Sequence, residues 1–124
     1  MRRGKGEDVV ADPSVETAVS GRCLVARVSG GMDHASDPAL RAQLRQLIVQ
    51  GNRFIVLDLS RVSFCDSSGL NMLLGVWRQA NAVASVVVLA CVPDRLRRIL
   101  QITGADQVLR VYDTVTDAQA GLNT

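Results

Sequence analysis

The sequence has few of the residues that usually carry catalysis, metal binding or base stacking. Its 124 residues include one histidine, and its three cysteines contain no C-x-x-C pair, so neither a zinc site nor a disulfide framework is expected. One tryptophan, one tyrosine and two phenylalanines are available for stacking, and the formal net charge is only +2, which does not favour nucleic acid as a partner. We therefore expect no metal and no cofactor, and we interpret the cysteines as small buried hydrophobic residues.

Long apolar runs are absent as well. No stretch approaches the roughly 18 consecutive apolar residues of a transmembrane helix, and the charged start MRRGKGEDVV has no apolar signal-peptide core. We expect no membrane contact and a cytoplasmic protein. The apolar fraction of 48% is enough for one hydrophobic core. The length suits one domain, which we place at residues 14–124 after a flexible tail at residues 1–13.

Four segments are predicted to contain the strands. Residues 15–30 (VETAVSGRCLVARVSG) indicate a hairpin around Ser20-Gly21. Residues 54–60 (FIVLDLS) and 85–91 (SVVVLAC) are almost entirely apolar, as in strands that helices cover on both faces. Residues 107–112 (QVLRVY) form a last short strand. With helices between them, these segments predict an α/β domain with a mixed, mostly parallel sheet of four to five strands.

About four helices are predicted, each with a polar residue that can cap its start. The expected caps are Asp37, with Pro38 at the first helical position, then Asp66, then Asp94, and finally Asp113 or Thr114. The first and third helices are predicted to end at Gly51 and Gly104. Residues 30–38 (GGMDHASDP) are predicted to be a loop.

Residues 63–73 (SFCDSSGLNML) concentrate polar side chains at a corner between a strand and a helix. Asp66 is predicted to accept a hydrogen bond from the free N–H of Ser68 or Gly69. Ser67 then becomes the first helical residue, exposed at the positive end of the helix dipole. In open α/β sheets, the carboxyl ends of the strands are where binding sites usually lie.

Three interpretations of this corner remain open on the residues alone. The first is a helix cap, in which Ser68 and Gly69 are small residues that allow close packing. The second is a nucleophilic serine, although G-x-S-x-G is absent and the only histidine, His34, is distant in the sequence. The third is a regulatory serine, whose phosphate the free N–H groups at the helix start would stabilise.

The central segment, residues 54–80 (FIVLDLSRVSFCDSSGLNMLLGVWRQA), resembles the centre of the STAS domain of bacterial anti-sigma factor antagonists. The residues that match the pattern of that family are Asp58, Asp66, Ser67, Ser68, Gly69 and Leu70. Residues 29–44 resemble the Gly-x-Leu-Asp loop and first helix, with Asp33 at the aspartate position, and residues 92–122 resemble the closing segment. Three features depart from the pattern. The segment NAVASVVV lacks the Gly-Gly pair that often precedes the fourth strand, Gly104-Ala105 stands where the family usually has Gly-Leu near the end of the third helix, and the tail 1–13 has no counterpart.

The resemblance implies a transcriptional regulator without enzymatic activity. An unphosphorylated antagonist of this family binds an anti-sigma factor, itself a serine kinase of the histidine-kinase-like ATPase fold, and so frees a sigma factor. The kinase then phosphorylates the first serine of the motif, here Ser67, and a metal-dependent phosphatase reverses the modification. The residues expected to contact the partner are Asp33, Asp58, Asp66, Ser68, Gly69 and Asn71. The alternatives are a STAS scaffold or ligand-sensing module and, more distantly, a small serine hydrolase.

Overall fold

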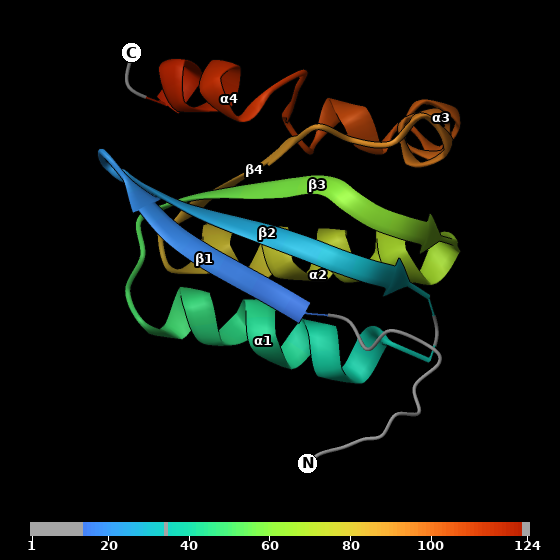
Figure 1. Ribbon diagram of the computed structural model, residues 1–124, viewed down its shortest axis with the longest axis horizontal. Coiled ribbons are helices and arrows are strands. Elements are labelled where there is room, and N and C mark those ends of the chain that lie inside the picture. The colour runs from blue at the N-terminus through green and yellow to red at the C-terminus, as the bar shows by residue number, and fades with distance from the viewer. Residues whose placement is uncertain (1–13, 34, 123–124) are drawn as a thin grey trace.

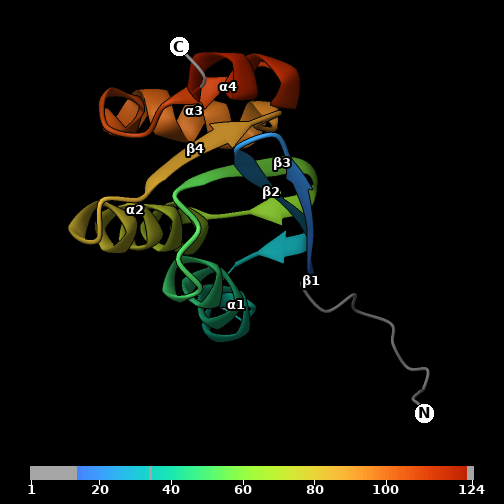
Figure 2. The same cartoon turned by 90° about the vertical axis from the view of Figure 1, so that its left-hand side faces the viewer.

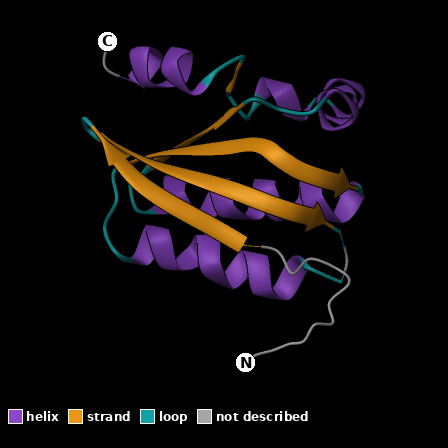
Figure 3. Cartoon of the chain, viewed as in Figure 1, coloured by secondary structure: helices purple, strands orange, loops and turns teal. Residues whose placement is uncertain are grey.

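A five-stranded sheet runs through residues 14–33 and 35–122, the part of the chain that the computed structural model describes (Figures 1 and 3). The strands are β1 (Ser14–Ser20), β2 (Cys23–Met32), β3 (Phe54–Cys65), β4 (Val86–Ala90) and β5 (Val111–Tyr112). Their order in the sheet is the same as their order in the chain. β1 pairs with β2 in the antiparallel sense, and the remaining neighbours are parallel. The predicted mixed, mostly parallel sheet is confirmed, whereas the predicted tail and His34 lie outside the described residues.

Four α-helices cover the two faces of this sheet. They are α1 (Asp37–Val49), α2 (Ser67–Ala82), α3 (Asp94–Thr103) and α4 (Val115–Leu122), and a short 3₁₀ helix spans Ala105–Gln107. The buried residues of α1, α2 and α3 belong to one apolar cluster and those of α4 belong to another, so the first three helices cover one face of the twisted sheet and α4 covers the other. Figure 2 shows α4 on the opposite side of the sheet from α1 and α2. Gly51 and Gly104 have φ values of +90° and +79° directly after α1 and α3, as expected of glycines that end helices.

Successive residues along a strand point to opposite faces of the sheet, so the apolar side chains form two clusters, one on each face. Leu57 packs with Leu44 of α1 and Leu73 of α2 in the larger cluster. Val56 packs with Ala118 of α4 in the smaller one. The cysteines are free thiols within these layers: Cys23 and Cys65 are buried and Cys91 is half-buried. Burial raises the pKa of Cys65 and of Cys91, so both thiols are protonated at neutral pH.

Two strands extend further than the sequence predicted. β2 continues through Gly30 to Met32, where we expected a loop, and β3 continues past Ser60 to Cys65. The pairing steps from Arg27–Asp58 to Ser29–Arg61, so β3 holds one extra residue there and bulges. Bulges of this kind break the apolar alternation that would otherwise mark a strand, which is why the pattern resembled a loop.

Two helix starts differ by one residue from the prediction. α1 begins at Asp37 itself. Instead of capping the helix, the Asp37 carboxylate forms an ion pair with Arg41, with 3.2 Å between Oδ1 and Nη2. α3 likewise begins at Asp94, which makes no capping bond. The last helix follows the prediction, because Thr114 Oγ1 accepts a hydrogen bond from the Asp117 amide at 3.0 Å. The fourth predicted cap, Asp66, belongs to the candidate site.

Candidate functional site

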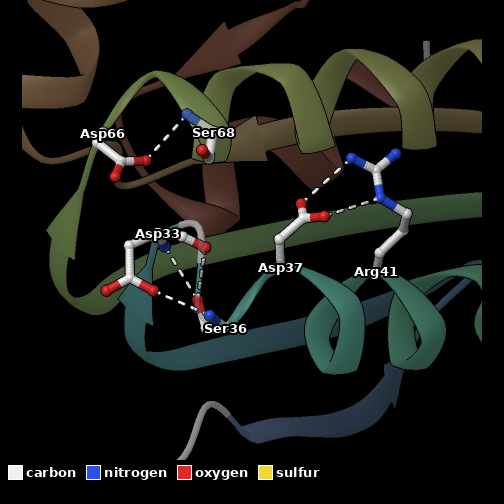
Figure 4. Close-up of polar contacts among 6 residues, drawn as sticks. All are labelled: Asp33, Ser36, Asp37, Arg41, Asp66 and Ser68. Carbon is white, nitrogen blue, oxygen red and sulfur yellow. Dashed lines mark hydrogen bonds and ion pairs between the residues drawn. The ribbon is translucent and has the colours of Figure 1, made fainter.

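The corner predicted around Asp66 lies where β2 and β3 end and α2 begins. The Asp66 amide donates a hydrogen bond to the Met32 carbonyl at 3.3 Å, which ties the end of β3 to the end of β2. Asp33 is the next residue after Met32, so the two segments bring Asp33 and Asp66 to the same edge of the sheet (Figure 4). Parallel pairing of β2 and β3 produces this meeting, since the carboxyl ends of parallel strands share one edge.

Asp66 caps α2, as predicted. Its backbone is extended, with φ −130° and ψ −167°, and its Oδ1 atom accepts a hydrogen bond from the Ser68 amide at 2.9 Å (Figure 4). Its carbonyl accepts a second bond from the Gly69 amide at 3.0 Å. The cap satisfies N–H groups that would otherwise have no partner in the first turn of the helix.

Ser67 and Ser68 differ in exposure at this capped start. Ser67 is the first residue of α2 and is exposed, whereas Ser68 is half-buried. No acidic residue follows in the first turn of the helix. The hydroxyl at position 67 therefore faces solvent at the positive end of the α2 dipole, where added negative charge is favoured.

Gly69 sets how closely α2 approaches the end of β2. A Cβ atom at this position would lie 2.8 Å from the Met32 carbonyl oxygen and 3.2 Å from the Met32 Cβ. The oxygen belongs to the backbone and cannot move aside cheaply. The corner therefore requires a glycine two residues after Ser67, for packing rather than for backbone conformation.

Asp33 is fixed by a reciprocal pair of hydrogen bonds with Ser36. The Ser36 amide donates to Asp33 Oδ1 and the Asp33 amide donates to Ser36 Oγ, both at 2.9 Å (Figure 4). The Ser36 hydroxyl donates in turn to the Gly31 carbonyl at 2.7 Å. The bond from the Ser36 amide is the main reason why the pKa of Asp33 is lowered, so this carboxylate is charged at neutral pH. Sequence reasoning missed Ser36, although the D-x-x-S spacing of a capping turn could have indicated it.

Asp58 does not join this corner. It lies in the middle of β3 with 4% of its surface exposed. Its carboxylate accepts hydrogen bonds from the Ser60 amide at 3.0 Å and from Arg27 Nε at 3.3 Å. The bond from Ser60 is thus made within the bulge of the strand that contains Asp58. Asn71, by contrast, is exposed one turn beyond Ser67 on α2.

Within the described ranges, no cluster of three or more histidine, cysteine or acidic side chains is arranged to hold a metal ion. Helices long and apolar enough to cross a membrane are also absent from this part of the chain.

The family model of the STAS domain matches residues 14–118. The chain belongs to the STAS domain family. It is 30% identical over 96 residues to the anti-sigma F factor antagonist of Paenibacillus polymyxa, an alignment that covers 77% of this chain and 82% of that protein. It is 29% identical over 100 residues to the anti-sigma-B factor antagonist of Staphylococcus aureus, covering 81% of this chain and 93% of that protein.

Solved STAS structures share the same fold. The crystal structure of an anti-sigma factor antagonist from Mycobacterium paratuberculosis matches with a TM-score of 0.84 at 24% identity, covering 94% of this chain and 100% of that chain. The Bacillus cell fate determinant SpoIIAA in its phosphorylated form matches with a TM-score of 0.67 at 28% identity, covering 88% and 99%. The resemblance inferred from the sequence is confirmed. STAS antagonists are regulatory binding proteins, so the prediction of no enzymatic activity is supported and the serine hydrolase alternative is wrong.

Proposed function

We propose that this STAS domain is an anti-sigma factor antagonist whose binding is switched by phosphorylation of Ser67. The observation that carries the proposal is the placement of Ser67, an exposed hydroxyl on the first residue of a helix that Asp66 caps. The names of the curated relatives support the general role. A relative solved in a phosphorylated form supports the modification.

The partner in this proposal is an anti-sigma factor that is itself a serine kinase of the histidine-kinase-like ATPase fold. The unphosphorylated chain binds this kinase, and the sigma factor is released. The kinase transfers phosphate to Ser67 and the complex dissociates, and a metal-dependent serine phosphatase returns the chain to its binding form. These steps follow from the family resemblance of the corner residues.

The geometry explains how one phosphate could disrupt binding without unfolding the domain. A phosphoserine carries a charge of about −1.5 to −2, which the N-terminus of α2 favours. The same charge adds to the carboxylates of Asp33 and Asp66 at this edge and would oppose the phosphate groups of a nucleotide in the kinase. Like charges that meet in an interface cost several kcal/mol, and each ~1.4 kcal/mol changes the affinity tenfold.

We assign different roles to the residues predicted to contact the partner. Asp33, Asp66 and Asn71 offer polar side chains to the kinase from the surface around Ser67. Ser68 and Gly69 act mainly by fixing the start of the helix, since Ser68 donates to the cap and Gly69 is buried against Met32. The remaining candidate, Asp58, supports the strand that leads to the corner and, being buried, is not available to a partner.

The first test is the position of the phosphate. After incubation with the cognate kinase and ATP, mass spectrometry should find phosphate on Ser67, because this hydroxyl is exposed and Ser68 is half-buried. Ser68→Ala is the matched control and should still accept one phosphate. Stoichiometric phosphate on a Ser67→Ala chain would refute the assignment.

The second test is binding. Ser67→Ala adds no charge and should bind the ADP-loaded kinase like the unmodified chain. Ser67→Asp places a negative charge beside Asp66 and should bind at least tenfold more weakly in titration calorimetry, equivalent to ~1.4 kcal/mol. Raised salt should recover part of the difference. Equal affinities of the two variants would place the corner outside the interface and favour the scaffold alternative.

A further inference from the structure

A hollow opens at the end of the strands opposite to Ser67, between the last turns of α1 and α2. Its volume is about 460 Å³. The residues that line it are Ile48, Val49, Gly51, Arg53, Gln79, Val83, Ala84 and Ser85. Arg53 directly precedes β3, and Ser85 directly precedes β4, so the hollow lies at the amino ends of these parallel strands. The switch proposed above therefore does not involve it.

Two valines on the rim of the hollow expose large apolar surfaces. Val49 at the end of α1 is 66% exposed and Val83 at the end of α2 is 59% exposed. Isolated exposed valines are common, but these two line the same concave surface. Their position makes the hollow suitable for an apolar side chain of another segment.

The turn beside Val83 keeps a conformation that is unfavourable for its residue. Ala84 has a φ of +61°, a left-handed conformation that is unfavourable for residues other than glycine. The turn is nevertheless well fixed, because the Ser85 amide donates to the Ala80 carbonyl at 2.9 Å and the Ser85 hydroxyl donates to the Asn52 carbonyl at 2.9 Å. It is also the place where the sequence lacks the glycine pair of the family pattern. Strained positions that persist in a fixed structure often lie at binding sites.

The rim of the hollow carries positive charge. Arg53 lines it, and no lining residue is acidic. The guanidinium carbon of Arg53 lies 5.8 Å from the centre of the Phe54 ring, and that of a second arginine, Arg22, lies 4.9 Å from the centre of the same ring. An occupant that fits should carry carboxylates next to aliphatic side chains.

The chain itself contains such a segment. Residues 7–12 read Glu-Asp-Val-Val-Ala-Asp, with two adjacent valines between acidic residues. This segment lies in the tail 1–13, which also has no counterpart in the family pattern. We propose that residues 7–12 dock into this hollow on a second copy of the chain, with the valines on Val49 and Val83 and the carboxylates facing Arg53.

The reach of the chain explains why the occupant comes from a second copy. Residue 14 begins β1 beside Ser29, near the carboxyl end of β2, and six residues later Ser20 reaches the amino end beside Cys23. That distance along the sheet is about 20 Å, and the hollow lies two strands further across. Even fully extended, the five residues from Val9 to Ser14 span at most about 18 Å. The segment therefore cannot seat its valines in the hollow of its own chain.

The test uses the full-length, ¹⁵N-labelled chain and a synthetic peptide of residues 6–13 (GEDVVADP). Titration of the peptide should shift the amide resonances of Val49, Val83 and Ser85 and leave those of Ser67 and Asp33 unchanged. A control peptide with serine at both valine positions should bind at least tenfold more weakly. Absence of shifts, or shifts centred elsewhere, would overturn the proposal.

The second measurement is self-association of the full chain by sedimentation equilibrium. The apparent mass should rise with concentration for the unaltered chain. It should stay at the monomer value for Val83→Asp, which places a carboxylate on a rim position that is 59% exposed. Ser67→Asp is the control at the other end of the strands and should associate like the unaltered chain. If the peptide binds but the chain stays monomeric, or if Val83→Asp associates equally, docking on a second copy is wrong.

Discussion

Asp58 shows at the scale of one residue how a buried carboxylate can support a site that it does not touch. Burial alone would raise its pKa, but the hydrogen bonds from the Ser60 amide and from Arg27 outweigh burial and lower it below the ordinary value of 3.8. The native state thus binds fewer protons than the unfolded state around this pH. The stabilisation that Asp58 contributes is complete above pH 3.8 and is lost as the pH falls through its lowered pKa.

Asp58→Asn should lower the free energy of unfolding at pH 7 by about 1 kcal/mol, because asparagine can still accept from Ser60 but carries no charge for Arg27. The difference from the unaltered chain should narrow as the pH falls below 3.8 towards the lowered pKa of Asp58, because the carboxylate becomes protonated first in the unfolded chain and then in the folded one. Urea denaturation at pH 7 and pH 3 measures both values. A difference that stays constant with pH would contradict the role of the charge.

Residues whose partners are close in sequence could be predicted. Asp66, Ser67 and Ser68 lie within one helix turn, so the spacing was enough to predict the cap and the exposure of Ser67. The partner of Asp58 could not be predicted, because Arg27 is 31 residues away and the bulge that presents the Ser60 amide leaves no local pattern.

At the scale of the element, α2 contains two glycines with different roles. A Cβ at Gly69 would meet the backbone oxygen of Met32 at 2.8 Å. A Cβ at Gly75 would meet Nη1 of Arg41 at 2.7 Å, which is the far end of a flexible side chain. Only the first contact holds the helix start against the sheet.

Gly69→Ala should therefore destabilise the domain by about 1–3 kcal/mol, as overpacking does. Gly75→Ala should be neutral or stabilise by up to about 1 kcal/mol, since Arg41 can move and alanine favours the helix. Thermal denaturation of the two variants provides the comparison. Equal destabilisation of both would mean that Gly69 has no special contact.

The bounds of the elements were harder to predict than their order. The predicted strand ended at Ser60, whereas β3 continues through a bulge to Cys65 by pairing with β2. The start of α1 was misplaced by one residue because Asp37 is a good capping residue in isolation, whereas Ser36, which precedes it, is engaged by Asp33. The first case depends on pairing with β2, which is distant in the sequence, whereas the second depends on a local turn between Asp33 and Ser36.

At the scale of the whole molecule, the proposed switch should act on the surface and leave the fold unchanged. Ser67 is exposed and its helix start favours negative charge. Ser67→Asp should keep the circular dichroism spectrum and a Tm within a few degrees of the unaltered chain, as expected for ~1 kcal/mol or less. A large fall in Tm would show that the Ser67 hydroxyl has a structural role.

The agreement between strand order and chain order has a consequence for how the protein is made. Each strand from β2 to β5 pairs with the strand that was synthesised just before it, so its partner is already available when it leaves the ribosome. During translation the sheet can grow at one edge, and each helix can cover the apolar face of strands that have already emerged. We therefore expect the nascent chain to expose little unpaired strand at the ribosome, which lowers its need for chaperones.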